Sequence, residues 1–255
     1  MEVSALASGS SGNCFYIKNN KSSILVDAGI SCKQIETRLE KLGESPEKIK
    51  GIFITHEHGD HIRGADVFAR KFKVPIFATS QTIDSKLICS DSKLIREMKN
   101  NQIIKIANLK VKSFSKSHKA VDPVSFCIKG DKKIAVITDL GFICENTQTA
   151  ISKSDAIFIE ANHDIEMLSN GPYPAFLKRW ISGDTGHLSN EQALDGILNY
   201  ASKNLKTIIL SHLSEKNNCP KIAAQTFQDN LNSRKDLSPQ VIVSEKFEPT
   251  SLIKV

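Results

Sequence analysis

The sequence lacks the features of a membrane protein and of a disulfide-stabilised scaffold. No apolar run approaches the roughly 20 residues that a membrane-spanning helix needs, and the chain does not start with the basic and apolar segments of a secretory signal. The six cysteines lie far apart without a Cys-x-x-Cys pair, which argues against a zinc ribbon and a disulfide framework. We therefore expect a cytoplasmic protein with reduced thiols and no membrane partner.

Low-complexity tracts and Pro/Gly/Ser-rich linkers are also missing. Nothing in the composition divides the 255 residues, so we expect residues 1–255 to form a single domain. The hydrophobic content of 40% and the charged content of 24% are those of an ordinary globular protein. The formal net charge of +6 favours anionic partners, although it identifies none of them.

Short β-branched, apolar runs alternate with amphipathic helical patterns along the chain. We predict strands at residues 23–26, 51–55, 74–78, 109–114, 133–138, 156–159, 207–210 and 241–243. We predict helices at residues 32–42, 63–72, 189–202 and 221–231. Strands that alternate with helices predict an α/β, layered fold. The segment Ser8–Asn13 is expected to be a tight loop between two strands.

Two short segments of the chain resemble each other. Residues 24–29 and 136–141 are both apolar strands that end in Asp-x-Gly, with Asp27 and Asp139 as the acidic residues. The similarity suggests two related halves, but six residues are too few to establish a repeat.

Ionisable residues follow six of the predicted strands. They are Asp27, His56, His118, Asp139, Glu160 with His163, and His212. Because layered α/β proteins build their sites in the loops beyond strand ends, this placement predicts that these residues belong to a functional site.

The densest group is the run His56-Glu57-His58-Gly59-Asp60-His61. His56 and His58 are two apart in an extended turn, so both imidazoles can reach one cation. Asp60 and His61 come where the chain enters the helical pattern near Arg63, and they can point at a neighbouring ion. Imidazole and carboxylate ligands suit zinc, manganese or iron better than magnesium or calcium.

The order of these residues resembles the metallo-β-lactamase superfamily over essentially the whole chain. The matching positions are Asp27, His56-x-His58-x-Asp60-His61, His118, Asp139 and His212. Within the superfamily the sequence is similar to the YycJ (WalJ) group, through residues 8–13, 160–164 and 186–191. The resemblance implies a four-layer αββα sandwich with a dinuclear site at one edge of its two sheets.

The resemblance also implies two divalent metal ions per chain, zinc or manganese, with iron possible. One ion would be held by His56, His58 and His118, and the second by Asp60, His61 and His212, with Asp139 bridging. Asp27 would orient a ligand. Asp139 stands where the best-known β-lactamases carry a cysteine, and His58 where oxygen-reducing di-iron relatives carry a glutamate. These two differences make β-lactam hydrolysis and di-iron oxygen reduction less favoured activities.

Two such ions would suit phosphodiester hydrolysis. A divalent metal lowers the pKa of bound water from about 15.7 towards 7, so that a metal-bound hydroxide is available at neutral pH. With Asp60 and Asp139 among the catalytic ligands, we expect His187 to protonate the leaving group. His187 precedes a capping box, Ser189-x-x-Gln192, and the N-terminus of a helix suits phosphate.

Several further residues are candidates for substrate contact. Ser189, Glu160 and His163 are expected to orient other site residues or to touch the substrate. Lys178 and Arg179, together with Arg63, could bind a phosphate backbone, although adjacent cations more often form a solvated face. The Ser8–Asn13 loop could donate amides to a phosphate, with a plain tight turn as the equal alternative.

The leading hypothesis is a dinuclear metal-dependent phosphodiesterase that acts on nucleic acid, a DNA exonuclease of the YycJ type. Hydrolysis of a small thioester, lactone or cyclic phosphodiester at the same metals is the alternative within enzymes. A binding or regulatory protein that has lost catalysis is the alternative from another class. The residues leave open the physiological metal, the choice between DNA and RNA, the polarity of cleavage and the oligomeric state.

Overall fold

The computed structural model describes all 255 residues, which divide into two compact units. Unit 1 comprises Met1–Ser115, Ala120–Asp131 and Glu245–Val255, and unit 2 comprises Lys116–Lys119 and Lys132–Ser244. No helix in either unit combines the length and the apolar character that crossing a bilayer requires.

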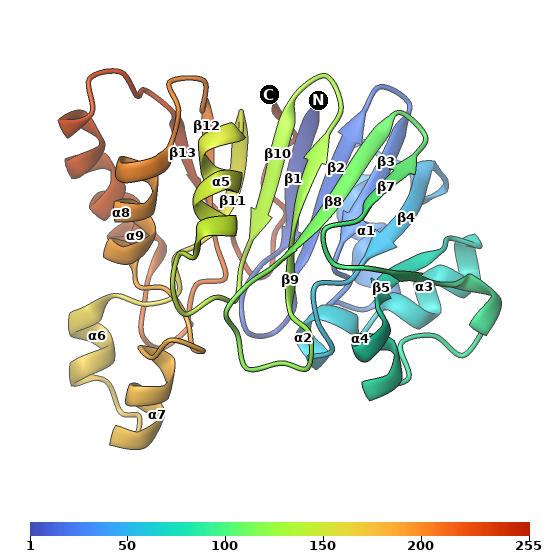
Figure 1. The fold of residues 1–255 in the computed structure, drawn as a ribbon, viewed down its shortest axis with the longest axis horizontal. Helices are drawn as coiled ribbons and strands as arrows, with labels where there is room; N and C mark the ends of the chain where they lie inside the picture. The colour runs from blue at the N-terminus through green and yellow to red at the C-terminus, as the bar shows by residue number, and fades with distance from the viewer. The chain divides into compact units, whose positions relative to one another are not determined.

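A seven-stranded mixed sheet is the centre of unit 1 (Figure 1). In spatial order its strands are β14 (Ile253–Lys254), β1 (Glu2–Ala7), β2 (Cys14–Asn19), β3 (Ser22–Val26), β4 (Ile49–Phe53), β5 (Ile76–Thr79) and β6 (Ile95–Met98). Neighbours from β14 to β3 are antiparallel, and neighbours from β3 to β6 are parallel. Because β3 and β4 are parallel, the residues that follow these two strands lie at the same edge of the sheet.

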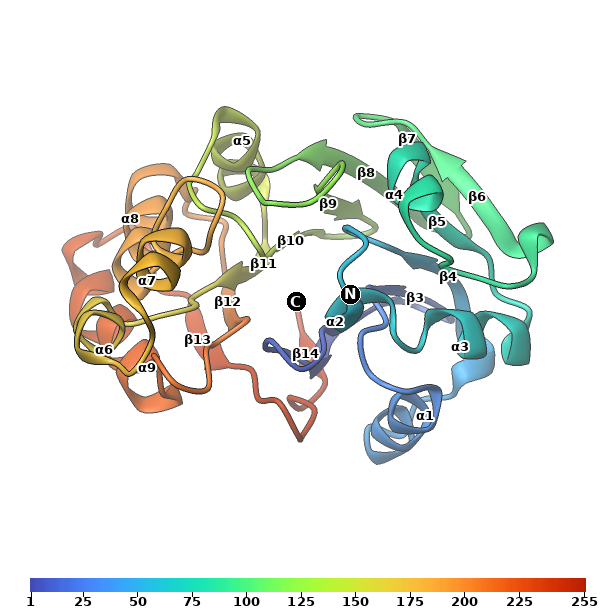
Figure 2. The ribbon, with the colours of Figure 1, turned by 90° about the horizontal axis from the view of Figure 1, so that it is seen from below.

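Helices cover one face of this sheet (Figure 2). They are α1 (Cys32–Lys41) and α3 (Ala65–Phe72), with the shorter α2 (Gly59–Ile62) and α4 (Ser80–Ser85) in the connections. Ile35 and Leu39 of α1 and Phe68 of α3 are fully buried and join the apolar core of this face. A capping box at Ser31 and Gln34 fixes the start of α1.

An antiparallel group of three strands covers the other face within unit 1. These strands are β7 (Ile103–Ile106), β8 (Leu109–Ser115) and β9 (Val124–Lys129). Phe126 of β9 meets Phe53 of β4 edge-on at a ring-centroid distance of 5.7 Å, and Phe53 also stacks on Phe77 at 4.7 Å. Aromatic contacts therefore join β4, the strand that leads into the histidine cluster, to β9 through Phe126 and to β5 through Phe77.

Unit 2 is built on four parallel strands, β10 (Lys133–Ile137), β11 (Ala156–Glu160), β12 (Thr207–Ser211) and β13 (Gln240–Val243). Three helices pack on it and on one another: α5 (Glu145–Lys153), α8 (Asn190–Tyr200) and α9 (Pro220–Asn230). The short helices α6 (Ile165–Asn170) and α7 (Ala175–Ile181) follow β11 and lie at one end of this unit (Figure 1).

The predicted elements are present with small changes in their bounds. Every predicted strand exists within two residues of its expected ends, and Ser8–Asn13 is the loop between β1 and β2. The helix expected at residues 63–72 is α3, and it is preceded by a separate helical turn, α2, which the sequence did not predict. Asp60 and His61 lie inside this turn, in which the backbone N–H groups of His61 and Arg63 donate to the carbonyls of His58 and Gly59.

Candidate active site

A carboxylate at the end of β3 organises the site residues of unit 1. Asp27 is fully buried, and its backbone N–H donates to the carbonyl of Phe53 at 2.8 Å, which extends the pairing of β3 with β4. Its Oδ1 accepts from the backbone N–H of Thr55 at 2.8 Å, and its Oδ2 accepts from the Thr55 hydroxyl at 2.9 Å and from Nδ1 of His61 at 2.7 Å. A carboxylate can only accept, so His61 carries its proton on Nδ1 and its Nε2 keeps a lone pair.

The histidines of the cluster lie together around this carboxylate. His56 and His61 are fully buried, and their ring centroids are 4.0 Å apart. Nε2 of His56 lies 3.0 Å from Nδ1 of His58, and Nε2 of His61 lies 3.4 Å from Oδ2 of Asp60. The four predicted ligands of unit 1 thus lie next to one another, and each belongs to a group whose ligand atoms are close enough to hold a metal ion.

The loop before β2 is held against the cluster by its last residue. Nδ2 of Asn13 lies 3.3 Å from Nε2 of His61 and 3.4 Å from Oδ2 of Asp60. The backbone N–H groups of Gly9, Gly12 and Asn13 all donate to oxygens of unit 1. Because these amides are already used, the structure supports the tight turn rather than a phosphate cradle.

Close backbone approach explains a glycine beside the cluster. A Cβ at Gly29 would lie 1.6 Å from the carbonyl oxygen of Asp60, so no larger residue fits there. Arg63, one of the candidates for phosphate contact, donates to the carbonyl of Ser11 at 2.9 Å.

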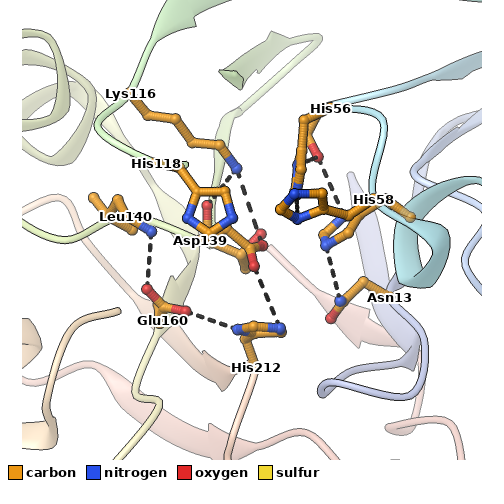
Figure 3. A network of polar contacts seen from close by, with 12 residues as sticks. Asn13, His56, His58, Lys116, His118, Asp139, Leu140, Glu160 and His212 are labelled. Atoms are coloured by element: carbon orange, nitrogen blue, oxygen red, sulfur yellow. Dashed lines mark hydrogen bonds and ion pairs between the residues drawn. The ribbon is translucent and has the colours of Figure 1, made fainter. Parts of the chain in front are cut away.

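Glu160 organises the site residues of unit 2 (Figure 3). It lies at the end of β11 and is fully buried. Its Oε2 accepts from the backbone N–H groups of Leu140 at 3.0 Å and Leu188 at 3.1 Å, and its Oε1 lies 2.9 Å from Nδ1 of His187 and 2.7 Å from Nδ1 of His212. Burial alone would raise the pKa of Glu160, but His187 and His212 more than offset this effect and lower it. Glu160 is therefore an ionised acceptor that orients two imidazoles.

Asp139 and His212 face each other at the ends of β10 and β12 (Figure 3). Nε2 of His212 lies 3.4 Å from Oδ1 of Asp139. Ligand atoms of Asp139, Glu160, His187 and His212 lie within 4.8 Å of one another, as in a metal site. Both oxygens of Glu160 already accept hydrogen bonds, so Glu160 orients the imidazoles, and Nε2 of His212 and the Asp139 carboxylate are atoms of this group that could hold a metal.

The backbone at these strand ends repeats between the units. Asp27 and Asp139 have φ angles of 59° and 58°, and His212 also has a φ of 58°. This left-handed conformation is uncommon outside glycine, asparagine and aspartate. The similarity of residues 24–29 and 136–141 therefore extends to their local conformation.

His118 and His187 lie in neighbouring loops of unit 2. Their ring centroids are 5.3 Å apart, and Nδ1 of His118 is 3.4 Å from the carbonyl of Gly186. Burial lowers the pKa of His118 to about 3, which keeps its imidazole neutral and suited to ligation. The ring of His187 meets Trp180 edge-on at 5.6 Å, so that Trp180 and Glu160 together fix its orientation.

The loop that carries His187 leads into the predicted capping box. The Ser189 hydroxyl accepts from the backbone N–H of Gln192 at 3.1 Å, and the Gln192 side chain accepts from the backbone N–H of Ser189 at 2.8 Å. Ser189 also forms an isolated β-bridge with His163. Ser189 and His163 thus support the His187 loop without touching Glu160 through their side chains.

Four residues near the site were given no individual role from the sequence. Thr55 links Asp27 with His56 and His61, and Asn13 reaches Asp60 and His61. Lys116, whose side chain is fully buried, donates to the carbonyl of Thr138 at 2.6 Å and lies 4.0 Å from Asp139. Asn162 donates to the carbonyl of His212 at 2.9 Å. Their only sequence signal is adjacency to a predicted site residue or to a strand end.

Comparisons with known proteins identify the family of the chain. The sequence model of the metallo-beta-lactamase superfamily matches residues 7–86. The exodeoxyribonuclease WalJ of Streptococcus pneumoniae is 39% identical over 238 residues, which cover 90% of this chain and 88% of that protein. The exodeoxyribonuclease YycJ of Bacillus anthracis is 34% identical over 240 residues, covering 92% and 90% of the two chains.

A solved structure confirms the fold class. The metallo-beta-lactamase fold protein YhfI of Bacillus subtilis has a TM-score of 0.71 to this chain at 14% identity, and 98% of each chain is covered. The expectation of an α/β sandwich of the metallo-β-lactamase type is therefore correct.

Proposed function

Because this chain belongs to the metallo-β-lactamase superfamily, we propose that it is a metal-dependent exodeoxyribonuclease that hydrolyses phosphodiester bonds at the ends of DNA strands. The relatives named exodeoxyribonuclease span nearly the whole chain and support the choice of substrate. The observation that carries the proposal is the buried Glu160, which holds His187 and His212 beside Asp139. This group combines a metal-binding pair with a histidine that can act on protons.

The proposed cofactors are two divalent ions, zinc or manganese, with iron as a further possibility. His56, His58 and His118 would hold one ion and Asp60, His61 and His212 the other, with Asp139 as a further ligand, and we propose that residues 1–255 act as a single catalytic domain. The residues fit such ions, because Asp27 and Glu160 hold His61 and His212 through Nδ1, with Nε2 of each imidazole 3.4 Å from the carboxylate of Asp60 or Asp139. Bound ions would supply Lewis acidity and a nucleophilic water at neutral pH.

The remaining chemistry belongs to the protein's own side chains. Glu160 accepts a hydrogen bond from Nδ1–H of His187, so the protonated form of His187 would present its Nε2–H to the leaving oxygen. The His187 side chain is 12% exposed, which leaves it within reach of a substrate. The Lys116 ammonium lies 4.0 Å from Asp139 and offsets part of the negative charge of its carboxylate. Each of these contacts is made before substrate binds, so little rearrangement is needed in the reaction.

The other hypotheses receive less support. Nothing in the two units favours a thioester or lactone as substrate, and the intact pairing of Asp139 with His212 speaks against a chain that has lost catalysis. All six cysteines are free thiols, which supports the proposal of a cytoplasmic location.

Digestion of end-labelled DNA and RNA, single- and double-stranded, with zinc, manganese and iron added in turn tests the proposal. We expect stepwise shortening of DNA that disappears in Asp139→Ala and in Asp139→Asn, which tolerates the backbone conformation. Asp195→Ala, an exposed position on α8, is the control and should digest DNA normally. Full activity of the Asp139 variants would show that the site is wrong, and turnover of a thioester without DNA cleavage would reject the substrate.

A further inference from the structure

A pocket lies in unit 2 between the loop after β11 and helix α7. It has a volume of about 420 Å³, within the range of small-ligand sites. Ile165 and Leu168 of α6 form part of its wall, and Lys178 and Arg179 of α7 supply two cations. No aspartate or glutamate lines it, so its charge is positive. The pocket therefore combines an apolar wall with two cationic side chains.

Histidine 163 contributes a buried polar atom to this pocket. The residue lines the pocket and is 2% exposed, and its Nδ1 has no hydrogen-bond partner in the protein. A buried polar atom without a partner is costly, and a bound ligand would satisfy it. Burial lowers the pKa of His163 to about 4, so the ring is neutral at physiological pH and can still donate one hydrogen bond.

The two cations differ in how they are held. Nζ of Lys178 donates to the carbonyl of Ser169 at 2.6 Å, and this hydrogen bond links helix α7 to the end of α6. Arg179 is exposed and has no carboxylate partner among the ion pairs of the structure. A guanidinium can donate two parallel hydrogen bonds to a phosphate, whereas the ammonium acts as a point charge.

The pocket shares two chain segments with the candidate active site. His163 follows Glu160 by three residues, and Ser189, which also lines the pocket, follows His187 by two. His163 and Ser189 are paired in a β-bridge. A group bound here is therefore positioned by the same two loops that hold Glu160 and His187.

We propose that this pocket binds the terminal phosphomonoester of a nucleic acid strand, with the last base against Ile165 and Leu168. This inference rests on the proposed nuclease function and adds the feature that selects strand ends. A terminal phosphomonoester carries between about 1.5 and 2 negative charges at neutral pH, whereas an internal phosphodiester carries one. Lys178, Arg179 and His163 thus favour an end over the interior of a strand.

Binding of oligonucleotides tests the proposal without relying on cleavage. The metal-loaded protein is titrated with fluorescent oligonucleotides whose linkages are non-hydrolysable methylenephosphonates, carrying a 5′-phosphate, a 3′-phosphate or hydroxyls at both ends. Two charge-assisted hydrogen bonds predict at least about tenfold tighter binding of one phosphorylated form than of the hydroxyl form. Whichever phosphate is preferred identifies the end that the pocket takes.

The double variant Lys178→Met/Arg179→Met is expected to bind all three forms equally. The matched control is Lys203→Met/Lys206→Met, which removes two exposed cations of the same unit, one of which also donates to a backbone carbonyl. The control should keep the full preference. His163→Phe, which fills the space without a donor, should reduce the preference, and thermal melting confirms that each variant is folded.

The outcomes separate this inference from the proposed function. Equal binding of all three oligonucleotides by the wild type, or an unchanged preference in the Lys178→Met/Arg179→Met variant, would overturn the pocket assignment even if DNA is digested. Failure of the wild type to digest DNA with any metal would instead overturn the proposed function, whatever the binding preference.

Discussion

Asp27 and His61 are joined by a hydrogen bond of 2.7 Å between Oδ2 and Nδ1, and neither side chain is exposed to solvent. Glu160 and His212 repeat this bond at 2.7 Å in the other unit. In each pair the Nε2 of the imidazole then lies 3.4 Å from a second carboxylate, Asp60 or Asp139. In each unit, therefore, a buried carboxylate orients one imidazole so that its Nε2 lies near a second carboxylate.

The bond from Asp27 predicts a loss of metal affinity in Asp27→Asn. Asparagine tolerates the backbone conformation at this position, but its amide cannot replace the carboxylate as acceptor for both Thr55 and His61. Loss of such an orienting partner typically weakens metal binding by about 10–100-fold. Competition with a chromophoric chelator measures this change. Asp66→Asn, at an acidic residue of α3 that bonds Arg70, is the control, and equal affinity of all three proteins would contradict the role of Asp27.

His187 is predicted to matter only where the leaving group needs a proton. His187→Ala should slow DNA hydrolysis by about 100–10,000-fold, the usual range for loss of a general acid. A p-nitrophenyl phosphodiester releases a stable phenolate, so its hydrolysis should change little. Rates on the two substrates, with metal content measured in parallel, test this prediction. An equal loss on both substrates would assign His187 to binding or positioning instead.

The two capping boxes of the chain allow a matched test of the His187 loop. Ser31→Ala and Ser189→Ala each remove the hydroxyl that caps a helix, and each should lower the free energy of unfolding by about 1 kcal/mol. Only Ser189→Ala should also reduce kcat on DNA, because Ser189 lies two residues from His187. Urea denaturation and initial rates provide the measurements. A similar fall in kcat in Ser31→Ala would show that general stability is responsible.

Burial of His163 predicts a specific pH dependence of stability. Its folded pKa is about 4 against an ordinary value of 6.5, so above pH 6.5 neither state binds the proton. Between pH 6.5 and 4 the unfolded chain binds it and the folded chain does not, so stability falls as the pH falls. At pH 4 this group lowers the free energy of unfolding by about 3 kcal/mol relative to neutral pH. Urea denaturation of wild type and His163→Gln over this range should give a flatter profile for the variant, and parallel profiles would contradict the assignment.

Much of this arrangement could be predicted from the sequence because it depends on strand ends. The strands that precede Asp27, Asp139, Glu160 and His212 are apolar, β-branched runs, and their pattern reveals both the strand and the polar residue that follows it. Helices α6 and α7 have only six and seven residues, too few for a clear amphipathic period. They could not be predicted, and the pocket that they border could not be predicted either.

Contacts between residues far apart in the sequence could not be predicted either, because no local pattern indicates them. The buried lysine Lys116 gives no local signal that its ammonium meets the carbonyl of Thr138, which is 22 residues away. Glu160 was only a candidate for an orienting role, because the bonds to Leu140 and Leu188 that saturate it come from two separate loops. Such pairings follow from tertiary packing and leave no periodic trace in the sequence.

The left-handed backbone at Asp27, Asp139 and His212 limits what evolution can place there. Each codon must encode a residue that supports the chemistry and also accepts a turn that disfavours branched side chains. Most random replacements at these positions would lower protein abundance together with activity. Glycine and asparagine should be the exceptions, giving well-folded but inactive proteins. A mutational survey that scores abundance and activity separately would therefore find its clearest inactive, abundant variants at these three strand ends.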